Sequence, residues 1–400
     1  MSPDPTTMTT AEKPPAADFT RSQTVALAVG AAGLVLSAVG WLTNSEQFYR
    51  SYLLGYLFWF GIALGSLPLN MLQHMTGGAW GLSIRRLLEA STRTLPLMAV
   101  LFVPIVLGMH SLYSWSRPEA VAADAVLRHK APYLNPTFWL VRTVLYFAIW
   151  IGLSWRLNAW SREQDRTGDA MLSRKMQTLS GPGVIFYFLA ISFAAIDWVM
   201  ALVPDWYSTI FGPLIAVGQV LNAFAFVVMM LALLARYEPF APRVGPPVFH
   251  DLGKLMLAFV MLWAYFSFSQ FLIIWAGNLP EEIHWYLEHS QGRWMAFGLV
   301  VNLLHFFVPF ALLLSRDLKR NLRLLARVAG FIMLMRFIEM FWMIAPLFHP
   351  QGFTIHWLDL AAPTGIGGIW LWWFFREAAA EPLLPLHDPY LQEAFEHVGH

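Results

Sequence analysis

Asp197 stands inside an otherwise apolar segment, residues 190–212, and its carboxylate is the first group there that could do chemistry. A charge at bilayer depth costs at least ~2.5–3.5 kcal/mol, so it needs a partner or a purpose. Arg142 lies six residues after Pro136, where the preceding apolar segment begins, and Asp197 lies six residues before Val203, where the expected span 184–203 ends. At 1.5 Å per residue, both would lie about 9 Å below the same surface. The spacing predicts an ion pair.

Two interpretations of that pair remain open from the sequence. A buried pair can lock two helices in register without adding stability. Alternatively, a carboxylate beside a cation can take up and release protons. Tyr146 and His110 are expected to line the same region as Asp197.

A second set of ionisable residues falls in the last two apolar segments. Arg336 and Glu339 are three residues apart and so share a helix face, as do His356 and Asp359. Chain direction places Glu339, His356 and Asp359 in the same half of a bilayer. Such a set predicts either polar contacts between helices or a proton half-channel.

Polar groups at mid-membrane are expected from Ser267, Ser269 and Gln270, where interhelical hydrogen bonds are worth only about 0.6–2 kcal/mol each. Of twelve histidines, only His305 is clearly mid-membrane, so no pair of histidines is expected to bind haem. The chain has no cysteine, which excludes disulfides and thiolate-bound zinc or iron–sulfur clusters. We therefore expect no cofactor bound by this chain.

These residues sit in a chain that is 57% hydrophobic and only 13% charged, whereas soluble domains carry about 25% charge. Runs of roughly 20 apolar residues predict an all-α integral membrane protein with ten transmembrane helices. The expected spans are residues 25–42, 52–72, 95–113, 137–155, 184–203, 209–234, 255–275, 294–314, 325–347 and 353–375. A net charge of +1 argues against nucleic acid as a partner.

Basic residues indicate the orientation, because they favour the cytoplasmic side. They gather in the N-terminal segment, the even-numbered loops and the C-terminal segment, whereas the odd-numbered loops hold only Arg50, Arg117, Arg128, Lys130 and Arg293. Both termini are therefore expected in the cytoplasm.

The expected organisation is a disordered tail at 1–22, a ten-helix domain at 23–376 and a cytoplasmic tail at 377–400. Residues 158–183 are expected to form a charged cytoplasmic stretch that ends where the sequence LSGPG breaks the helix. The outer loops at 114–136 and 277–293 are long enough to contact a partner.

Five separated blocks, in order along the chain, carry a family resemblance. They are WFGIALGSLPLNMLQHMTGGAWGLSIRRLLEA, KAPYLNPTFWLVRTVLYFAIW, LSGPGVIFYFLAISFAAIDWVMALVPDWYSTIFG, WAYFSFSQFLIIWAGNLPEEIHWYLEHSQGRW and LHFFVPFALLLSRDLKR. Over roughly residues 50–375 the chain resembles the ActF subunit family of bacterial alternative complex III, within the wider NrfD-like membrane family.

The resemblance implies two four-helix bundles with two flanking helices, in the bacterial cytoplasmic (inner) membrane. It implies a subunit of a quinol:cytochrome c or quinol:oxidase oxidoreductase complex, with a proton route or a second quinone site but no redox centre of its own. Expected partners are the lipid bilayer, an ActC-like quinol subunit, an iron–sulfur subunit, multihaem and monohaem cytochrome c subunits, and a terminal oxidase. Haem c and iron–sulfur clusters would then belong to the partners.

A self-standing secondary transporter or ion-conducting protein is the alternative from a different functional class. A transporter would purify and work alone, whereas a complex subunit would need haem-bearing partners.

Overall fold

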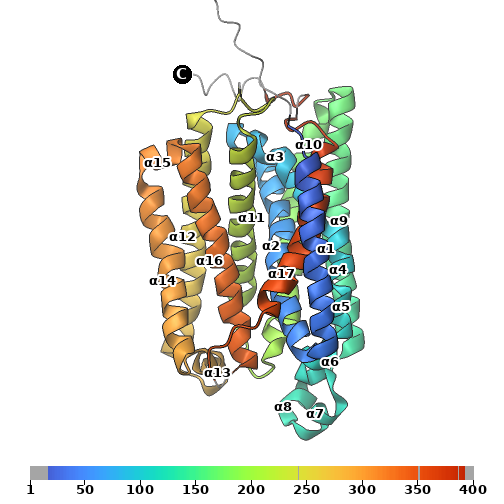
Figure 1. The fold of residues 1–400 in the computed structure, drawn as a ribbon, viewed down its shortest axis with the longest axis vertical. Coiled ribbons are helices and arrows are strands. Elements are labelled where there is room, and N and C mark those ends of the chain that lie inside the picture. Colours follow the sequence, from blue (N-terminus) through green and yellow to red (C-terminus); the bar gives the residue numbers. More distant parts are fainter. Residues whose placement is uncertain (1–16, 242, 350–351, 386, 392–400) are drawn as a thin grey trace, which may run out of the picture.

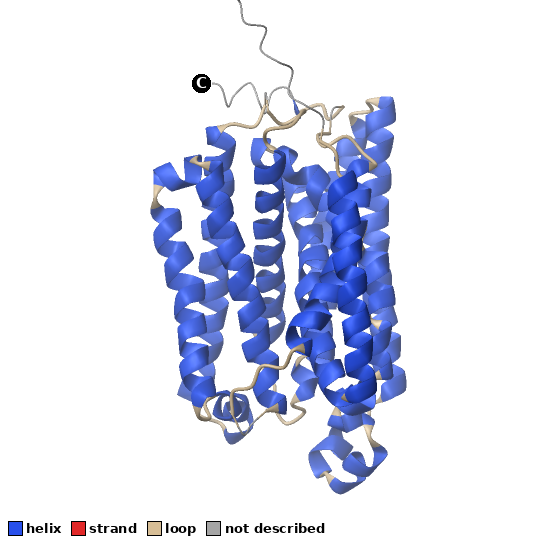
Figure 2. Ribbon diagram, in the orientation of Figure 1, coloured by secondary structure: helices blue, strands red, loops and turns tan. Residues whose placement is uncertain are grey.

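The computed structural model describes residues 17–241, 243–349, 352–385 and 387–391, and within them every regular element is a helix (Figures 1 and 2). The predicted tails at 1–22 and 377–400 therefore lie partly outside the described residues. The elements are α1 (Thr20–Thr43), α2 (Ser45–Thr76), α3 (Ala79–Thr92), α4 (Leu95–Leu101), α5 (Val103–Leu107), α6 (Met109–Leu112), η1 (Ser114–Ser116), α7 (Pro118–Ala123), α8 (Ala125–Lys130), α9 (Pro136–Thr167), α10 (Met171–Trp198), η2 (Met200–Leu202), α11 (Phe211–Leu234), α12 (Pro246–Gly277), α13 (Pro280–His289), α14 (Arg293–Leu314), α15 (Arg316–Arg320), α16 (Leu322–Phe348) and α17 (Leu358–Ala379).

Nine helical stretches in the described part of the chain are long and apolar enough to cross a membrane. They are α1, α2, the stretch Ala79–Leu107, α9, Met171–Leu202, α11, α12, α14 and α16. The tenth expected span corresponds to α17, which is not among the nine. Three tryptophans and several glycines lower the hydropathy of α17, although its 22 residues would reach about 33 Å.

The long helices alternate in direction and form one elongated bundle (Figure 1). We call the end that carries Thr20 and Ala379 the terminal end, and the end that carries α7, α8 and α13 the distal end. Helices α2 and α11 lie at the centre, and their apolar windows are 89% and 94% buried. Helices α12 and α14 are mostly exposed along their length, as expected for surfaces that face lipid.

Small residues bring α1 and α17 into direct backbone contact. A Cβ atom on Gly368 would lie 2.3 Å from the Gly30 backbone nitrogen, and one on Gly365 would lie 2.7 Å from the Leu34 nitrogen. Apolar side chains gain little free energy by moving from lipid to another helix. Close van der Waals packing between small residues therefore supplies much of the attraction between two such helices. This contact places α17 beside α1, at the opposite end of the sequence.

Two predicted boundaries are wrong. Helix α9 continues to Thr167 and α10 starts at Met171, so the expected charged stretch at 158–183 consists mostly of helix ends. Pro182 lies inside α10 and does not break it, because neighbouring helices support a proline within a membrane helix. The third span is interrupted instead, with short helices α4, α5 and α6 separated near Phe102 and Gly108.

At the distal end, α13 folds back onto the bundle through stacked aromatic rings. Trp285 stacks on Trp206 with ring centroids 5.4 Å apart, and the Trp206 indole donates to the Glu282 carbonyl at 2.9 Å. His289 stacks on Trp285 at 3.7 Å and places its two ring nitrogens 2.7 and 3.2 Å from the Trp285 and Met343 carbonyl oxygens. Burial lowers the pKa of His289 to about 4, although the two carbonyls oppose that shift.

We expect Gly368→Ala to destabilise the protein by about 1–3 kcal/mol, because the new methyl group would collide with the Gly30 backbone. The matched control is Gly152→Ala, on an exposed face of α9 with no atom within 4 Å of the added carbon. Thermal unfolding in detergent should show a lower midpoint for Gly368→Ala only. An equal effect of both substitutions would contradict the close helix contact.

We also expect the docking of α13 to weaken as the pH falls. A histidine whose pKa is lowered by folding is neutral in the folded state, so its contribution is complete above about pH 6.5 and declines toward pH 4. The protection of the α13 amides from hydrogen exchange, relative to the intrinsic exchange rate at each pH, should fall over this window. In His289→Gln this loss of protection should disappear, and its persistence would assign the pH dependence to another group.

Candidate functional site

The ion pair expected between Asp197 and Arg142 is present at the distal end of α9 and α10. Arg142 donates from Nε to Asp197 Oδ2 and from Nη2 to Oδ1, both at 2.8 Å. The Tyr146 hydroxyl donates to Oδ2 at 2.8 Å. Asp197 is fully buried, so its carboxylate meets a bidentate guanidinium and a phenol instead of water.

Aromatic side chains also contact the Arg142–Asp197 pair. The Arg142 guanidinium lies 3.8 Å from the Tyr133 ring centroid and 4.4 Å from that of Phe138. The Trp139 indole donates to the Asp197 backbone carbonyl at 2.9 Å. His110 is exposed and meets Ser116 at 3.2 Å instead of joining this cluster.

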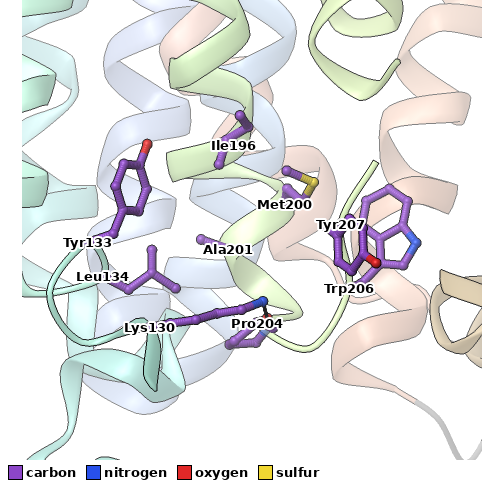
Figure 3. Close-up of a pocket in the computed structure, with 9 residues that line it drawn as sticks. All are labelled: Lys130, Tyr133, Leu134, Ile196, Met200, Ala201, Pro204, Trp206 and Tyr207. Carbon is purple, nitrogen blue, oxygen red and sulfur yellow. Dashed lines mark hydrogen bonds between the residues drawn. The ribbon is translucent and has the colours of Figure 1, made fainter. Parts of the chain in front are cut away.

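A pocket of ≈ 270 Å³ lies beside this cluster, between the segment that precedes α9 and the segment that follows α10 (Figure 3). Most of its lining is apolar, and the Lys130 side chain reaches across its floor to the Pro204 carbonyl. Tyr133 separates the pocket from Arg142, since its ring lines the pocket and also contacts the guanidinium.

A second buried site brings together α12, α14 and α16 near mid-depth. Glu339 forms an ion pair with Arg336, accepts a hydrogen bond from the Trp263 indole at 3.1 Å, and lies 3.0 Å from His305 Nδ1. That histidine contact is close but is not aligned as a hydrogen bond. Glu339 is about 14 Å from the distal end of α16 by helical rise, and His305 is fully buried.

Gly218 of α11 completes this site. A Cβ atom there would lie 2.3 Å from Arg336 Nη2, so the guanidinium occupies the space of a missing side chain. From the sequence, His305 was expected at mid-membrane and Glu339 in one half of the bilayer with His356 and Asp359, so their contact was not predicted.

Glu339 does not form a cluster with His356 and Asp359, since none of its hydrogen bonds or ion pairs among the described residues involves either of them. Asp359 accepts hydrogen bonds from Ser51 at 2.5 Å and Gln47 at 3.3 Å, both on α2. His356 precedes α17, and its backbone N–H donates to Asp359 at 2.8 Å. The reason is that α17 starts five residues later than expected and packs on α1 and α2.

The polar stretch of α12 also lies elsewhere than expected. Gln270 is seven residues from the distal end of α12, where it bonds Ser208 at 3.1 Å and Tyr286 at 3.4 Å. It therefore joins the loops of the distal end instead of the membrane centre. Ser267 and Ser269 are half-buried on the same helix.

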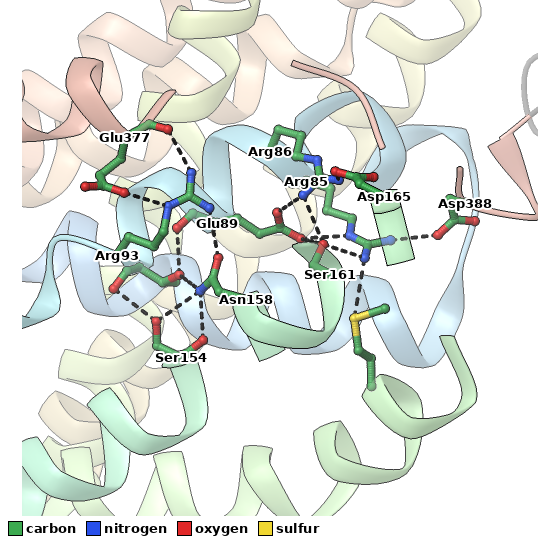
Figure 4. Close-up of polar contacts among 12 residues, drawn as sticks. Arg85, Arg86, Glu89, Arg93, Ser154, Asn158, Ser161, Asp165, Glu377 and Asp388 are labelled. Carbon is green, nitrogen blue, oxygen red and sulfur yellow. Dashed lines mark hydrogen bonds and ion pairs between the residues drawn. The ribbon is translucent and has the colours of Figure 1, made fainter. Parts of the chain in front are cut away.

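The largest polar network was missed by sequence analysis and lies at the terminal end (Figure 4). Glu89 pairs with Arg85 at 2.9 Å and with Arg86 at 2.6 Å, and it accepts from the Ser161 hydroxyl at 2.7 Å. Arg86 also pairs with Asp165. The two arginines are 1% and 3% exposed, so they are core residues and not loop residues. The sequence signal for this network was spacing, since Glu89 lies four residues after Arg85 and three residues after Arg86, so all three side chains share a helix face.

The C-terminal part of the chain contributes two carboxylates to this network. Asp388 pairs with Arg85 at 2.7 Å, and Glu377 pairs with Arg93 at 3.0 Å (Figure 4). Leu384 is completely buried nearby in the sequence, so the described part of residues 377–391 packs against the bundle. The described part of the predicted tail at 377–400 is therefore in contact with the helices.

Between the terminal-end network and Glu339, several buried polar atoms have no hydrogen-bond partner among the described residues. They are Asn70 Nδ2 and Oδ1, Gln73 Oε1 and His74 Nε2 on α2, and Gln219 Oε1 and Asn222 Oδ1 on α11. The Gln73 side chain packs on Gly81 of α3, and Gln219 packs on Gly61 and Gly65 of α2. Buried polar groups of this kind are normally satisfied by water.

Across the described part of the chain, no three His, Asp or Glu residues gather closely enough to hold a metal ion. A comparison with protein-family models finds no match for this chain, and neither does a comparison with curated proteins.

We expect Asp197→Asn to cost about 3–5 kcal/mol of stability, because it leaves the Arg142 charge buried without a counter-charge. Adding Arg142→Gln should recover most of the loss. The control is Glu46→Gln at the exposed Glu46–Arg50 pair, which should change stability by less than ~1 kcal/mol. Thermal unfolding of the wild type and these three variants tests this dependence, and a double variant as unstable as Asp197→Asn would argue against it.

Proposed function

We propose that this chain is a membrane subunit of a quinol-oxidising respiratory complex, without a redox centre of its own, and that it conducts protons through α2, α11 and α16. The five blocks of family resemblance support membership in the complex. The observation that carries the proton route is the buried carboxylate of Glu339 beside His305 at mid-depth. An ionisable pair so far from water is costly unless it has a purpose.

The two-bundle arrangement that belongs to this proposal would place α2, α3–α6, α9 and α10 in one bundle and α11, α12, α14 and α16 in the other, with α1 and α17 flanking them. Contacts within each group, such as α9 with α10 and α14 with α16, support it, although α2 also packs closely against α11 of the other group. The excess of basic residues at the terminal end supports a cytoplasmic location for that end. The α7–α8 hairpin and the exposed face of α13 then point toward extracytoplasmic partners.

The proton route would begin at the Arg85, Arg86 and Glu89 network. From there the unpartnered amides and His74 along α2 and α11 supply hydrogen-bonding positions, with water between them. Gln219 is the neighbour of Gly218, against which the Arg336 guanidinium lies. Glu339 and His305 would exchange the proton at mid-depth.

The outward half of the route would lead toward Asp359. A small cavity of ≈ 10 Å³, about the size of one water, is lined by Asp359, Arg50 and His349. Phe341, two residues beyond Glu339, lines the same cavity.

Asp197 fits a locking role better than a proton-carrying role. Both of its oxygens are already bound by Arg142, and Tyr146 adds a third hydrogen bond. Glu339 is also bound by an arginine and an indole N–H, but it has the His305 imidazole within 3.0 Å to exchange a proton with, whereas no hydrogen bond or ion pair of the described residues joins a histidine to Asp197.

The test separates assembly from proton movement. An affinity tag on this chain should co-purify haem-bearing subunits from native membranes, and recovery of the chain alone, without haem absorbance, would refute membership in the complex. In the reconstituted complex, Glu339→Gln should abolish proton translocation while quinol oxidation continues, because the titratable group is removed and the shape is kept.

Glu163→Gln, at an exposed carboxylate of α9 that forms no ion pair among the described residues, is the matched control and should translocate protons normally. Full translocation by an assembled Glu339→Gln complex would refute the route through Glu339 without affecting the assignment to a complex.

A further inference from the structure

The pocket beside Tyr133 has a polar end and an apolar body (Figure 3). Lys130 and Tyr207 lie toward its open, loop side, while Ile196 and Met200 of the α10 region line the deeper part. Its volume of ≈ 270 Å³ is not occupied by any other side chain of the described residues.

Lys130 brings a positive charge that forms no ion pair among the described residues. Its half-buried ammonium donates to the Pro204 carbonyl, and no carboxylate among the described residues forms an ion pair with it. Burial raises the pKa of the Tyr133 phenol to about 12, so this neighbour is neutral at physiological pH. A half-buried cation with only a carbonyl partner favours an anionic ligand.

The apolar end of the pocket continues as a stripe on the outside of α10. Phe193 and Leu189 lie one and two turns from Ile196 on the same helix face, and their side chains are 46% and 54% exposed. Trp206 and Tyr207 mark the level of the membrane–water interface, where aromatic residues concentrate. The stripe runs from this level toward the membrane centre.

We propose that this pocket binds one anionic phospholipid of the distal leaflet, with its phosphate at Lys130 and an acyl chain along Ile196, Phe193 and Leu189. The Lys130 charge would bind the phosphate of the headgroup, and the exposed apolar stripe would contact the acyl chain. A free phosphate ion would use the charge but leave the apolar wall unfilled. Lys130 is also one of very few basic residues in the loops of the distal end, where an anchoring charge is unusual.

The experiment is native mass spectrometry of the protein released from nanodiscs that contain phosphatidylglycerol and phosphatidylcholine. The wild type should retain one phosphatidylglycerol in preference to phosphatidylcholine. Lys130→Gln should reduce that preference about fivefold, the factor that one basic residue near a membrane supplies, while its amide can still donate to Pro204. Ile196→Trp should fill the pocket and displace the lipid.

Arg128→Gln is the matched control, because Arg128 is an exposed base on α8, two residues from Lys130. It should retain the lipid as the wild type does. Retention that is equal in all four proteins would identify a non-specific boundary lipid and overturn the proposal. A neutral ligand such as a quinone would survive Lys130→Gln and be lost only in Ile196→Trp, and displacement of the lipid by inorganic phosphate would assign the site to a soluble anion. Either result would also overturn the proposal.

Discussion

A charge withdrawn from water must meet an opposite charge, and this requirement governs which helices of this chain pack together. The bidentate pair of Arg142 and Asp197 joins α9 to α10, and the pair of Arg85 and Glu89 draws α9 and the C-terminal segment onto α3 through Ser161 and Asp388. Such pairs add little net stability over apolar packing, but breaking one is expensive. They therefore specify partners and register among helices whose apolar faces would otherwise be interchangeable.

Steric fit between the helices also determines which of them pack together. Glycines allow α1 and α17 to touch through their backbones, and Gly218 makes room for the Arg336 guanidinium at mid-depth. In lipid, apolar side chains gain little by changing neighbours, so steric fit and buried polar contacts decide the packing. The mid-depth site depends on steric fit and on charge, since Arg336 can reach Glu339 only because α11 has a glycine, Gly218, at that position.

The buried sites differ in how many of their polar atoms have a hydrogen-bond partner in the protein. This difference separates structural sites from sites that can exchange water, protons or a ligand. Asp197 has a full set of direct partners, as expected for a structural lock. His305 and the amides of α2 and α11 have buried atoms without a protein partner, as expected where water and protons move. Lys130 has a carbonyl partner but no counter-charge, as expected for a site that is completed by a ligand.

Hydropathy and charge in the sequence by themselves determined an all-helical chain, the approximate positions of its apolar spans, and the meeting of Arg142 with Asp197. That pair was predictable because consecutive antiparallel helices and a fixed rise per residue determine depth. Tertiary structure decided the rest. Helices that are apolar on all sides do not reveal which face meets which neighbour, so neither the contact between His305 and Glu339 nor the contact between Asp359 and α2 was predicted. Arg85 and Arg86 resembled loop residues because hydropathy measures the polarity of a residue, whereas burial depends on partners such as Asp165 and Asp388, which are distant in the sequence.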